Sequence, residues 1–206
     1  MIEIDLILEK LKESYPDARC ELDYQSPFQL LIATILSAQA TDKSVNKLTR
    51  TLFNDYPDLK AFLELSEMEI SDKIREIGLY KSKSKNIYRL CRILIDDYKG
   101  KVPETFEELV TLPGVGKKTA SVVLSVAFGI PALAVDTHVF RVTRRIGLTK
   151  QDTPDKVADD LMAKINKNKW IIAHHLFIFH GRRTCKARNP DCENCIINKE
   201  CKKIGI

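Results

Sequence analysis

Long hydrophobic runs are absent from this chain of 206 residues. A helix that crosses a membrane needs about 18 consecutive apolar residues, whereas the apolar stretches here are short, as at Val122-Val123-Leu124, which Ser125 interrupts. The first six residues also lack the basic and apolar regions of a signal or transit peptide. The sequence therefore argues against a membrane protein, and we expect a cytoplasmic one.

Aromatic residues, glycine and proline are also scarce: aromatics make up 7% of the chain, and there are eight glycines and eight prolines. Basic and aromatic residues do not interleave in the way that a stacking platform for single-stranded nucleic acid requires. With 44% hydrophobic and 30% charged residues, the composition is typical of globular proteins and excludes collagen, coiled coils and disordered chains. The length suits one or two compact domains.

The alternation of polar and apolar residues that marks a half-buried strand is missing as well. Two segments instead repeat apolar residues at the spacing of one helical face: Phe28, Leu31, Ile32, Ile35 and Leu36, and then Ile87, Leu90, Cys91, Leu94, Ile95 and Tyr98. Ser66 and Glu69 have the spacing of a capping box, and Gly129 followed by Pro131 is a helix stop. The pattern predicts an all-α chain of about ten helices, with a domain boundary near Pro131.

Positive charge is concentrated rather than diffuse. The net charge is +5, yet residues 1–30 hold three bases against seven acids. Residues 79–92 contain five bases and no acid: Lys81, Lys83, Lys85, Arg89 and Arg92. Such a patch indicates a surface that binds a polyanion, with a solvated helix face as the alternative.

Cysteine is concentrated near the C-terminus. Four of the six cysteines have the spacing C-x6-C-x2-C-x5-C: Cys185, Cys192, Cys195 and Cys201. In a reducing cytoplasm this set indicates a metal rather than disulfides. Structural zinc sites use paired close knuckles, and only one close pair exists here. The spacing therefore favours a [4Fe–4S] cluster, with zinc as the alternative, and we expect Cys20 and Cys91 to be small core residues.

Three histidines lie on the predicted helix that leads into the cysteines: His174, His175 and His180. Because four cysteines already complete a tetrahedral sulfur set, we expect these histidines to pack and to form hydrogen bonds rather than to bind metal. The single tryptophan, Trp170, is expected to pack as well.

A glycine-rich hairpin, LPGVGKKTA at residues 112–120, joins two predicted helices. Glycine lets the backbone approach a ligand, and amides at the start of a helix point outward. Gly114 and Gly116 therefore suit phosphate contacts without base readout, and Lys117 adds positive charge. The spacing is not that of a nucleotide-binding P-loop, and no strand precedes it. A plain connection between helices is the alternative.

Two reactive groups stand at consecutive helix starts. Lys118 lies in the first turn after the hairpin, where the helix dipole and Lys117 both disfavour an ammonium ion. Asp136 stands at the N-cap of the next predicted helix, which a purely capping role would explain. If the two face one cleft, they bring together an amine nucleophile and a carboxylate that accepts its proton or stabilises a cationic sugar.

The hairpin, the segment VDTH at residues 135–138 and the cysteine spacing together resemble the endonuclease III family of DNA glycosylases. This is the helix-hairpin-helix group with an iron–sulfur loop. The similarity extends to LSAQATD at residues 36–42, to GLY at residues 78–80 and to the histidine segment through Arg182. It implies a DNA-binding cleft between a six-helix barrel of residues 21–132, which carries the hairpin, and an iron–sulfur domain of residues 1–20 and 133–206.

The resemblance also implies an activity. A lysine at the position of Lys118 marks the bifunctional enzymes of this family, whereas adenine-mismatch glycosylases lack it. The implied reaction removes oxidised pyrimidines from DNA: Lys118 attacks the sugar C1′, the base leaves, and β-elimination through a Schiff base cuts the strand 3′ to the abasic site. Asp136 would assist by electrostatics and proton transfer. The [4Fe–4S] cluster would have a structural and DNA-binding role.

Further DNA contacts are implied. Leu79 is expected to wedge between bases, and Gln39 to form hydrogen bonds with the orphaned opposite base or its neighbours. The alternative makes Leu79 a core residue and Gln39 a polar group at a helix end. The remaining contacts expected are Gly114, Gly116, Lys117, His138, Lys186 and Arg188, with Arg182 and Arg183 facing phosphates.

The implied partner is double-stranded DNA that contains damaged bases or abasic sites. A monomer would bind it in a prokaryotic cytoplasm, in association with the nucleoid. Two other functions stay open: a non-catalytic DNA-binding module would keep the hairpin and basic patch without turnover. An electron-transfer protein would need the cluster alone, without Lys118 and Asp136.

Overall fold

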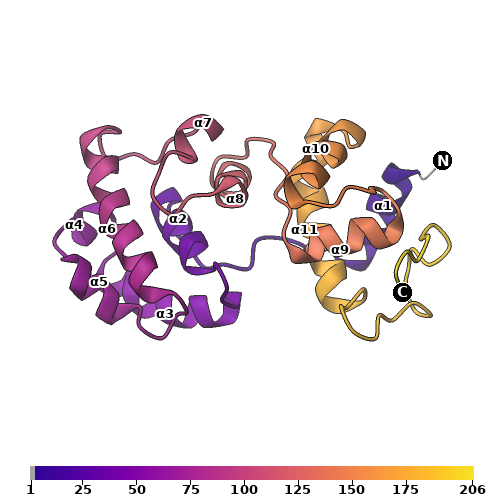
Figure 1. Ribbon diagram of the computed structural model, residues 1–206, viewed down its shortest axis with the longest axis horizontal. Helices are drawn as coiled ribbons and strands as arrows, with labels where there is room; N and C mark the ends of the chain where they lie inside the picture. The colour runs from indigo at the N-terminus through magenta and orange to yellow at the C-terminus, as the bar shows by residue number, and fades with distance from the viewer. Residues whose placement is uncertain (1–2) are drawn as a thin grey trace. The chain divides into compact units, whose positions relative to one another are not determined.

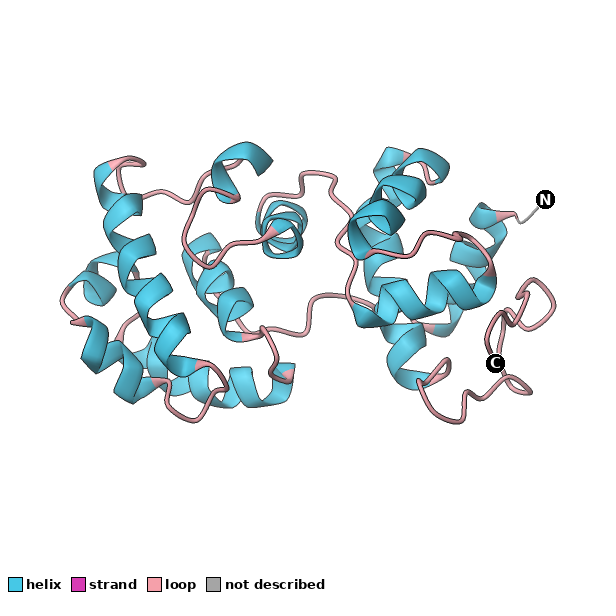
Figure 2. Cartoon of the chain, viewed as in Figure 1, coloured by secondary structure: helices cyan, strands magenta, loops and turns pink. Residues whose placement is uncertain are grey.

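The computed structural model describes residues 3–206. Over these residues the chain forms eleven α-helices and one short 3-10 helix, without a strand (Figure 2). The expectation of an all-α fold is confirmed. No helix in this described part is both long and apolar enough to cross a membrane.

The chain divides into two compact units (Figure 1). One unit is Glu21–Ile130. The other combines the described residues of Met1–Cys20 with Pro131–Ile206, so the N-terminal helix belongs with the C-terminal part of the chain. The assignment of residues 21–132 as a barrel and of 1–20 with 133–206 as an iron–sulfur domain remains a prediction.

The unit Glu21–Ile130 is built around α2. This helix is buried at every residue after Pro27 and packs against α3, α6 and α8. A helix that is apolar all round belongs inside a core, so α2 holds the other helices in place. The helices of this unit are α2 (Pro27–Leu36), α3 (Asp42–Asp55), α4 (Leu59–Leu63), α5 (Glu67–Lys73), α6 (Tyr80–Asp96), α7 (Phe106–Leu109) and α8 (Lys117–Ala127).

Short polar side chains start several of these helices. The predicted capping box is confirmed, since the Glu69 amide donates to Ser66 Oγ and the Ser66 amide donates to Glu69 Oε2. The stop after α8 is also confirmed, because Gly129 has a φ of +65° and the Ile130 amide donates to the Leu124 carbonyl at 3.0 Å. These local signals place the helix ends that carry the candidate site.

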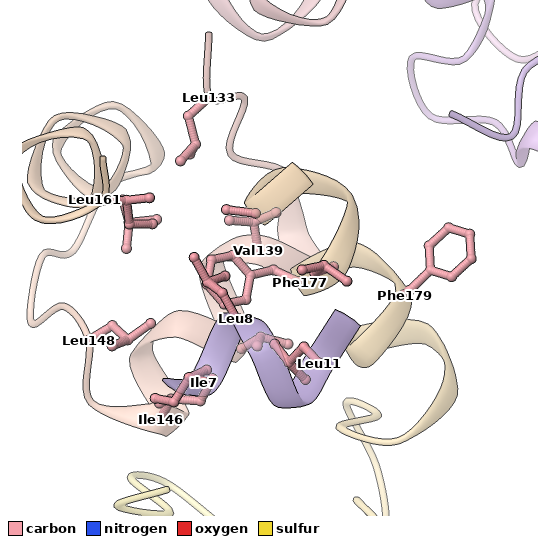
Figure 3. Packing of buried hydrophobic residues seen from close by; sticks show 14 of the residues in the cluster. Ile7, Leu8, Leu11, Leu133, Val139, Ile146, Leu148, Leu161, Phe177 and Phe179 are labelled. Atoms are coloured by element: carbon pink, nitrogen blue, oxygen red, sulfur yellow. The ribbon is translucent and has the colours of Figure 1, made fainter. Parts of the chain in front are cut away.

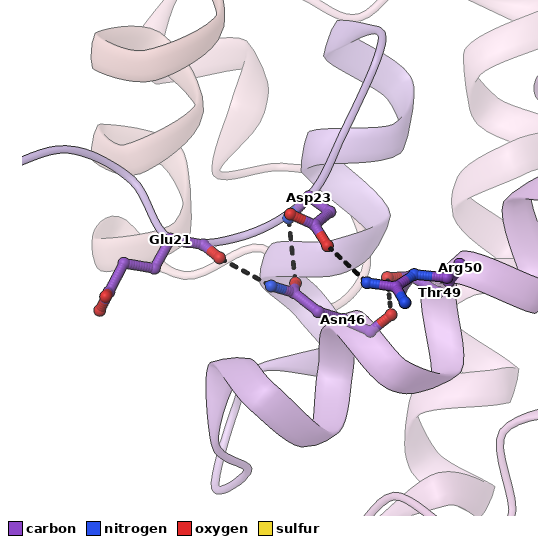
Figure 4. Close-up of polar contacts among 5 residues, drawn as sticks. All are labelled: Glu21, Asp23, Asn46, Thr49 and Arg50. Carbon is purple, nitrogen blue, oxygen red and sulfur yellow. Dashed lines mark hydrogen bonds and ion pairs between the residues drawn. The ribbon is translucent and has the colours of Figure 1, made fainter.

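The start of this unit is attached to α3 by polar contacts (Figure 4). Asn46 Nδ2 donates to the Glu21 carbonyl at 2.7 Å, and Asn46 Oδ1 accepts from the Asp23 amide at 3.0 Å. Arg50 lies 3.8 Å from the Asp23 carboxylate. One asparagine therefore satisfies both backbone groups of the entering segment.

The second unit packs α1 against α11, and α11 against α9. Its core contains Ile7, Leu11, Val139 and Phe177, each fully buried (Figure 3). The helices are α1 (Ile4–Ser14), α9 (Thr137–Ile146), α10 (Pro154–Lys164), the 3-10 helix Lys167–Lys169 and α11 (Trp170–Arg183). Residues 184–206, which contain the four spaced cysteines, follow α11 without further helix.

Two expectations about the core need correction. Cys91 is buried on α6 as expected, and burial raises the pKa of its thiol to about 12. Cys20 is only half-buried, so its assignment to the core was wrong. Ile95 is 43% exposed although it fits the apolar spacing of α6. Leu94, one residue before Ile95, is fully buried, so helical spacing alone does not decide which apolar residues of α6 the neighbouring elements cover.

Candidate functional site

The glycine-rich hairpin joins α7 to α8. Leu112 and Val115 are buried and anchor it, and the Val115 amide donates to the Leu112 carbonyl at 3.1 Å. Gly114 has a φ of +80°, and a Cβ there would lie 3.0 Å from the Asn86 Cβ, so the backbone and the neighbouring helix both require glycine. Gly116, the N-cap of α8, is exposed like Gly114. The hairpin thus presents backbone rather than side chains at the start of α8.

Lys118 is the second residue of α8 and therefore lies in its first turn, as predicted. Its side chain is exposed, as is that of Lys117 beside it. An exposed amine at this place can reach an electrophile that the hairpin amides hold nearby.

Asp136 is the N-cap of α9. Its Oδ1 accepts hydrogen bonds from the His138 amide at 2.9 Å and from the Val139 amide at 2.8 Å. The predicted capping role is confirmed, and it engages one of the two carboxylate oxygens. Lys118 belongs to the unit Glu21–Ile130, and Asp136 to the unit that contains Pro131–Ile206. Their action as a pair therefore stays a prediction.

The four spaced cysteines lie together around one small cavity of about 20 Å³. Burial, together with the neighbouring thiols, raises the pKa of Cys195 and of Cys201. Four thiolates gathered in this way need positive charge among them, which a metal centre supplies. No three His, Cys, Asp or Glu side chains within residues 3–206 form a site for one metal ion. The four sulfur donors, gathered in one place, suit a metal centre.

Two arginines of α9 hold the start of the cysteine segment. Arg141 donates through Nε and Nη2 to the Cys185 carbonyl at 3.2 and 3.1 Å. Arg145 donates to the carbonyls of Lys186 and Ala187 at 2.7 and 3.1 Å. Sequence reasoning missed both arginines, because no local pattern connects a helix to carbonyls about forty residues later.

The end of the chain returns to the same helix. The Lys202 amide donates to the Ile146 carbonyl at 3.1 Å, and the Ile204 amide donates to the Arg145 carbonyl at 3.0 Å. Gly147, with a φ of +89°, ends α9, and a Cβ there would lie 2.6 Å from the Lys202 side chain. The left-handed backbone at this position favours glycine, and the Lys202 side chain packs closely against it.

The histidines of α11 pack and form hydrogen bonds, as expected. His180 Nδ1 lies 3.0 Å from Tyr15 Oη, and its Nε2 lies 3.8 Å from Cys195 Sγ. Burial lowers the pKa of His180 to about 4, so the ring is neutral at pH 7. His174 Nδ1 lies 2.8 Å from the Ala134 carbonyl and so connects α11 to the segment before α9. A neutral His180 couples α1 to the cysteine segment through Tyr15.

Gln39 and Leu79 lie in two neighbouring turns of the first unit. Both have a left-handed backbone, with φ of +56° and +61°. A Cβ placed on Gly78 would lie 3.9 Å from the Gln39 carbonyl oxygen, so the turns are in contact. Leu79 is 55% exposed, which makes the alternative of a core residue wrong. Gln39 is exposed beyond the end of α2.

The remaining expected DNA contacts are mostly exposed. Lys186 and Arg188 are exposed on the cysteine segment. His138 is half-buried, its Nδ1 lies 3.2 Å from Arg141 Nη2, and burial lowers the pKa of its imidazole. The prediction that all five bases of residues 79–92 form an exposed patch was wrong for Lys83, whose exposure is only 4%. The other members stay exposed: Lys81, Lys85, Arg89 and Arg92.

An all-α fold with a helix-hairpin-helix element, a first-turn lysine and a four-cysteine segment defines the class of helix-hairpin-helix DNA glycosylases. A family model described as "HhH-GPD superfamily base excision DNA repair protein" matches residues 32–167, and the chain belongs to this family. Endonuclease III of Rickettsia conorii is 51% identical over 199 residues, which cover 96% of this chain and 94% of that enzyme. Endonuclease III of Escherichia coli is 47% identical over 95% of this chain and 92% of its own.

Solved structures agree with this assignment. A non-covalent endonuclease III–DNA complex is 47% identical, with a TM-score of 0.93, and covers 97% of this chain and 94% of its own. A trapped endonuclease III–DNA covalent intermediate, an estranged-adenine complex, is 48% identical with the same TM-score and coverage. The chain is therefore a bifunctional base excision repair enzyme of the endonuclease III type, a DNA glycosylase with AP lyase activity.

We expect Arg145→Ala to loosen the start of the cysteine segment. The change removes the charge-assisted hydrogen bonds to the Lys186 and Ala187 carbonyls. If their loss destabilises the segment by about 1.5 kcal/mol, local opening becomes about tenfold more frequent. Limited trypsin digestion should then cut faster after Lys186 and Arg188. The matched control is Arg144→Ala, because Arg144 is exposed and its guanidinium lies over the Phe140 ring instead. Equal cleavage rates in the two variants would contradict the role of Arg145.

Proposed function

We propose that this enzyme removes oxidised pyrimidines from double-stranded DNA and then cuts the strand 3′ to the abasic sugar, with Lys118 as the nucleophile. The observation that carries the proposal is the exposed Lys118 in the first turn of α8, directly after a hairpin that presents backbone. A relative that is 48% identical has been trapped as a covalent intermediate with DNA. An exposed amine next to a phosphate-binding hairpin is suited to form such a bond.

The proposed reaction begins at the neutral amine of Lys118. The lone pair of Nζ forms a bond to C1′, while the electrons of the C1′–base bond leave with the base, which takes up a proton. The nitrogen then loses one proton, and the C1′–O4′ bond breaks while O4′ takes up a proton, which opens the sugar ring and leaves a protonated imine between Nζ and C1′. Loss of a proton from C2′ expels the 3′ phosphate, and water finally hydrolyses the imine to release the enzyme.

Asp136 is proposed to assist electrostatically. Its carboxylate is held by two amides of α9, so the negative charge has a defined place. Such a charge stabilises the cationic sugar that develops as the base leaves, and it can accept the proton that the amine loses. Capping and catalysis are compatible, since the cap engages Oδ1.

Two kinds of DNA contact are proposed: backbone groups and cations that bind phosphates, and two side chains that insert among the bases. Gly114, Gly116 and Lys117 suit phosphates because the hairpin exposes its backbone there. Further contacts are proposed for His138, Lys186 and Arg188. Leu79 would fill the space that a flipped nucleotide leaves, and Gln39 would bond the opposite base. A monomer is proposed to be sufficient for this binding.

A [4Fe–4S] cluster is proposed to be held by Cys185, Cys192, Cys195 and Cys201. The support is the single cavity that the four side chains line, and their thiol chemistry. When bound, the cluster supplies a cationic centre to which four thiolates attach. Residues 184–206 have no helix of their own, so this attachment would order the segment that carries Lys186 and Arg188.

Lys118→Gln tests the nucleophile. With an oligonucleotide duplex that contains an oxidised pyrimidine, borohydride should link the wild-type enzyme to DNA, and the variant should neither link nor cut, because it lacks the amine. The matched control is Lys117→Gln, the adjacent exposed lysine, which should still be trapped when DNA is saturating. A Lys118→Gln enzyme that is trapped and cuts at the normal rate would disprove the assignment.

Asp136→Asn separates the two roles of Asp136. Asparagine caps a helix as well as aspartate does, so the melting temperature should hardly change while base removal slows by about 10² to 10⁴-fold. Asp136→Ala should lose the same rate and, in addition, about 1 kcal/mol of stability. Single-turnover rates and thermal unfolding measure the two effects. An Asp136→Asn enzyme with normal base removal would leave the residue with its capping role alone.

Metal analysis tests the cluster. The purified brown protein should contain about four iron and four sulfide per chain. Cys192→Ser should lose the iron and weaken DNA binding, while a preformed abasic site is still cut at saturating enzyme, because Lys118 lies in the other unit. Cys91→Ala, which changes a buried cysteine of α6, should keep the iron. Zinc in place of iron would contradict the proposal.

A further inference from the structure

Lys83 differs from the other cations of its helix. It is 4% exposed, whereas Lys81 and Lys85 on the same helix are exposed. Its Nζ donates to the Leu36 carbonyl at 2.8 Å and to the Ala38 carbonyl at 2.6 Å. The charge pattern of residues 79–92 placed Lys83 in a surface that binds a polyanion, yet its side chain is buried and its ammonium group donates to backbone carbonyls of the same unit.

Burying the ammonium group of Lys83 costs free energy unless other groups compensate its charge. Burial lowers the pKa of Lys83, because the buried ammonium loses hydration. The C-terminal end of α2, where the helix dipole is negative, offsets part of this cost, and the Leu36 and Ala38 carbonyls accept its hydrogen bonds. If packing were the only task, an apolar side chain of the same length would do it at lower cost. The hydrogen bonds themselves are therefore the useful feature.

The Leu36 carbonyl is at the last residue of α2, and the Ala38 carbonyl lies in the following turn of residues 37–40, which contains Gln39. Lys83 is also joined to the other turn, residues 77–79, because its backbone amide donates to the Leu79 carbonyl at 3.0 Å. One residue thus connects both turns, by its side chain on one side and by its backbone on the other. Gln39 and Leu79 each have a positive φ, which costs energy for a residue other than glycine. Such conformations persist only where neighbouring groups hold them.

We propose that Lys83 is a positioning residue that ties the Gln39 turn to the Leu79 turn and so sets the spacing between the two side chains that enter the DNA. This inference rests on the proposed function, in which Gln39 and Leu79 act on the duplex around a flipped nucleotide. Lys83 itself touches neither DNA nor the reacting atoms. It acts on the step in which the base leaves the stack, before Lys118 reacts.

The expected signature is a difference between two substrates. Without the hydrogen bonds of Lys83, a paired base should leave the stack more slowly, whereas a preformed abasic site has no base to unstack. Lys83→Met keeps an apolar stem of similar length and removes both hydrogen bonds. We expect it to slow single-turnover processing of a paired lesion by roughly ten- to hundredfold, and cutting of an abasic site by much less. Lys60→Met, the same change at an exposed position of α4 outside the basic patch, should leave the ratio of the two rates unchanged at saturating enzyme.

A double-mutant comparison shows whether Lys83 acts through the two turns. In the background Gln39→Ala with Leu79→Ala, the substitution Lys83→Met should have no further effect on the rate ratio, because nothing is left to position. The same loss in both backgrounds would overturn the inference. If Gln39→Ala and Leu79→Ala themselves leave the ratio unchanged while Lys118 is still trapped, then the proposed DNA roles of these two residues have failed, and the inference fails with them.

Folding is measured for every variant by thermal unfolding. If Lys83→Met does not fold, Lys83→Gln takes its place, since it keeps one short donor and loses the reach to both carbonyls. Lys83→Arg, which retains a cation with several donors, should recover most of the rate ratio. A folded Lys83→Met or Lys83→Gln enzyme with the wild-type ratio would overturn the positioning role.

Discussion

Peptide groups in the first and last turns of an α-helix cannot complete their hydrogen bonds within the helix, and they must find partners outside it. In this chain Asp136 accepts from two such amides at the start of α9, and Lys83 donates to the carbonyls at and beyond the end of α2. At the start of α8 the N-cap is Gly116, which has no side chain to offer. Asp136 and Lys83, which have proposed functions, therefore also complete the hydrogen bonds of helix ends. At α8 the candidate site is the open start of the helix itself.

Rigid cores keep these ends in place. In the unit Glu21–Ile130 the buried helix α2 packs against α3, α6 and α8, so the turns at Gln39 and Leu79 and the hairpin before α8 share one support. In the other unit, α11 packs against α1 and α9, and two arginines of α9 reach the cysteine segment. That segment has no helix, and the hydrogen bonds from these arginines to its carbonyls hold its start in place.

Much of the fold and of the site was predictable where the signal is local. The Ser66–Glu69 capping box, the end of α8 at Gly129 and the N-cap at Asp136 each depend on residues within one or two turns of one another. The apolar spacing of α2 and α6 predicted both helices. It failed at Ile95, because helical spacing says which residues share a face and not how far the neighbouring elements cover that face.

The sequence by itself determined the helices, their caps, the glycine hairpin and the cysteine spacing, since backbone sterics and local hydrogen bonds decide these features. Only the tertiary structure decided that Lys83 binds two carbonyls across the unit, that Arg145 holds residues some forty positions later, and that Tyr15 meets His180. The sequence does not distinguish a long polar side chain that donates hydrogen bonds to water from one that donates them to a distant carbonyl. Its partner is chosen when the helices pack, because burial then makes an unmet hydrogen bond costly.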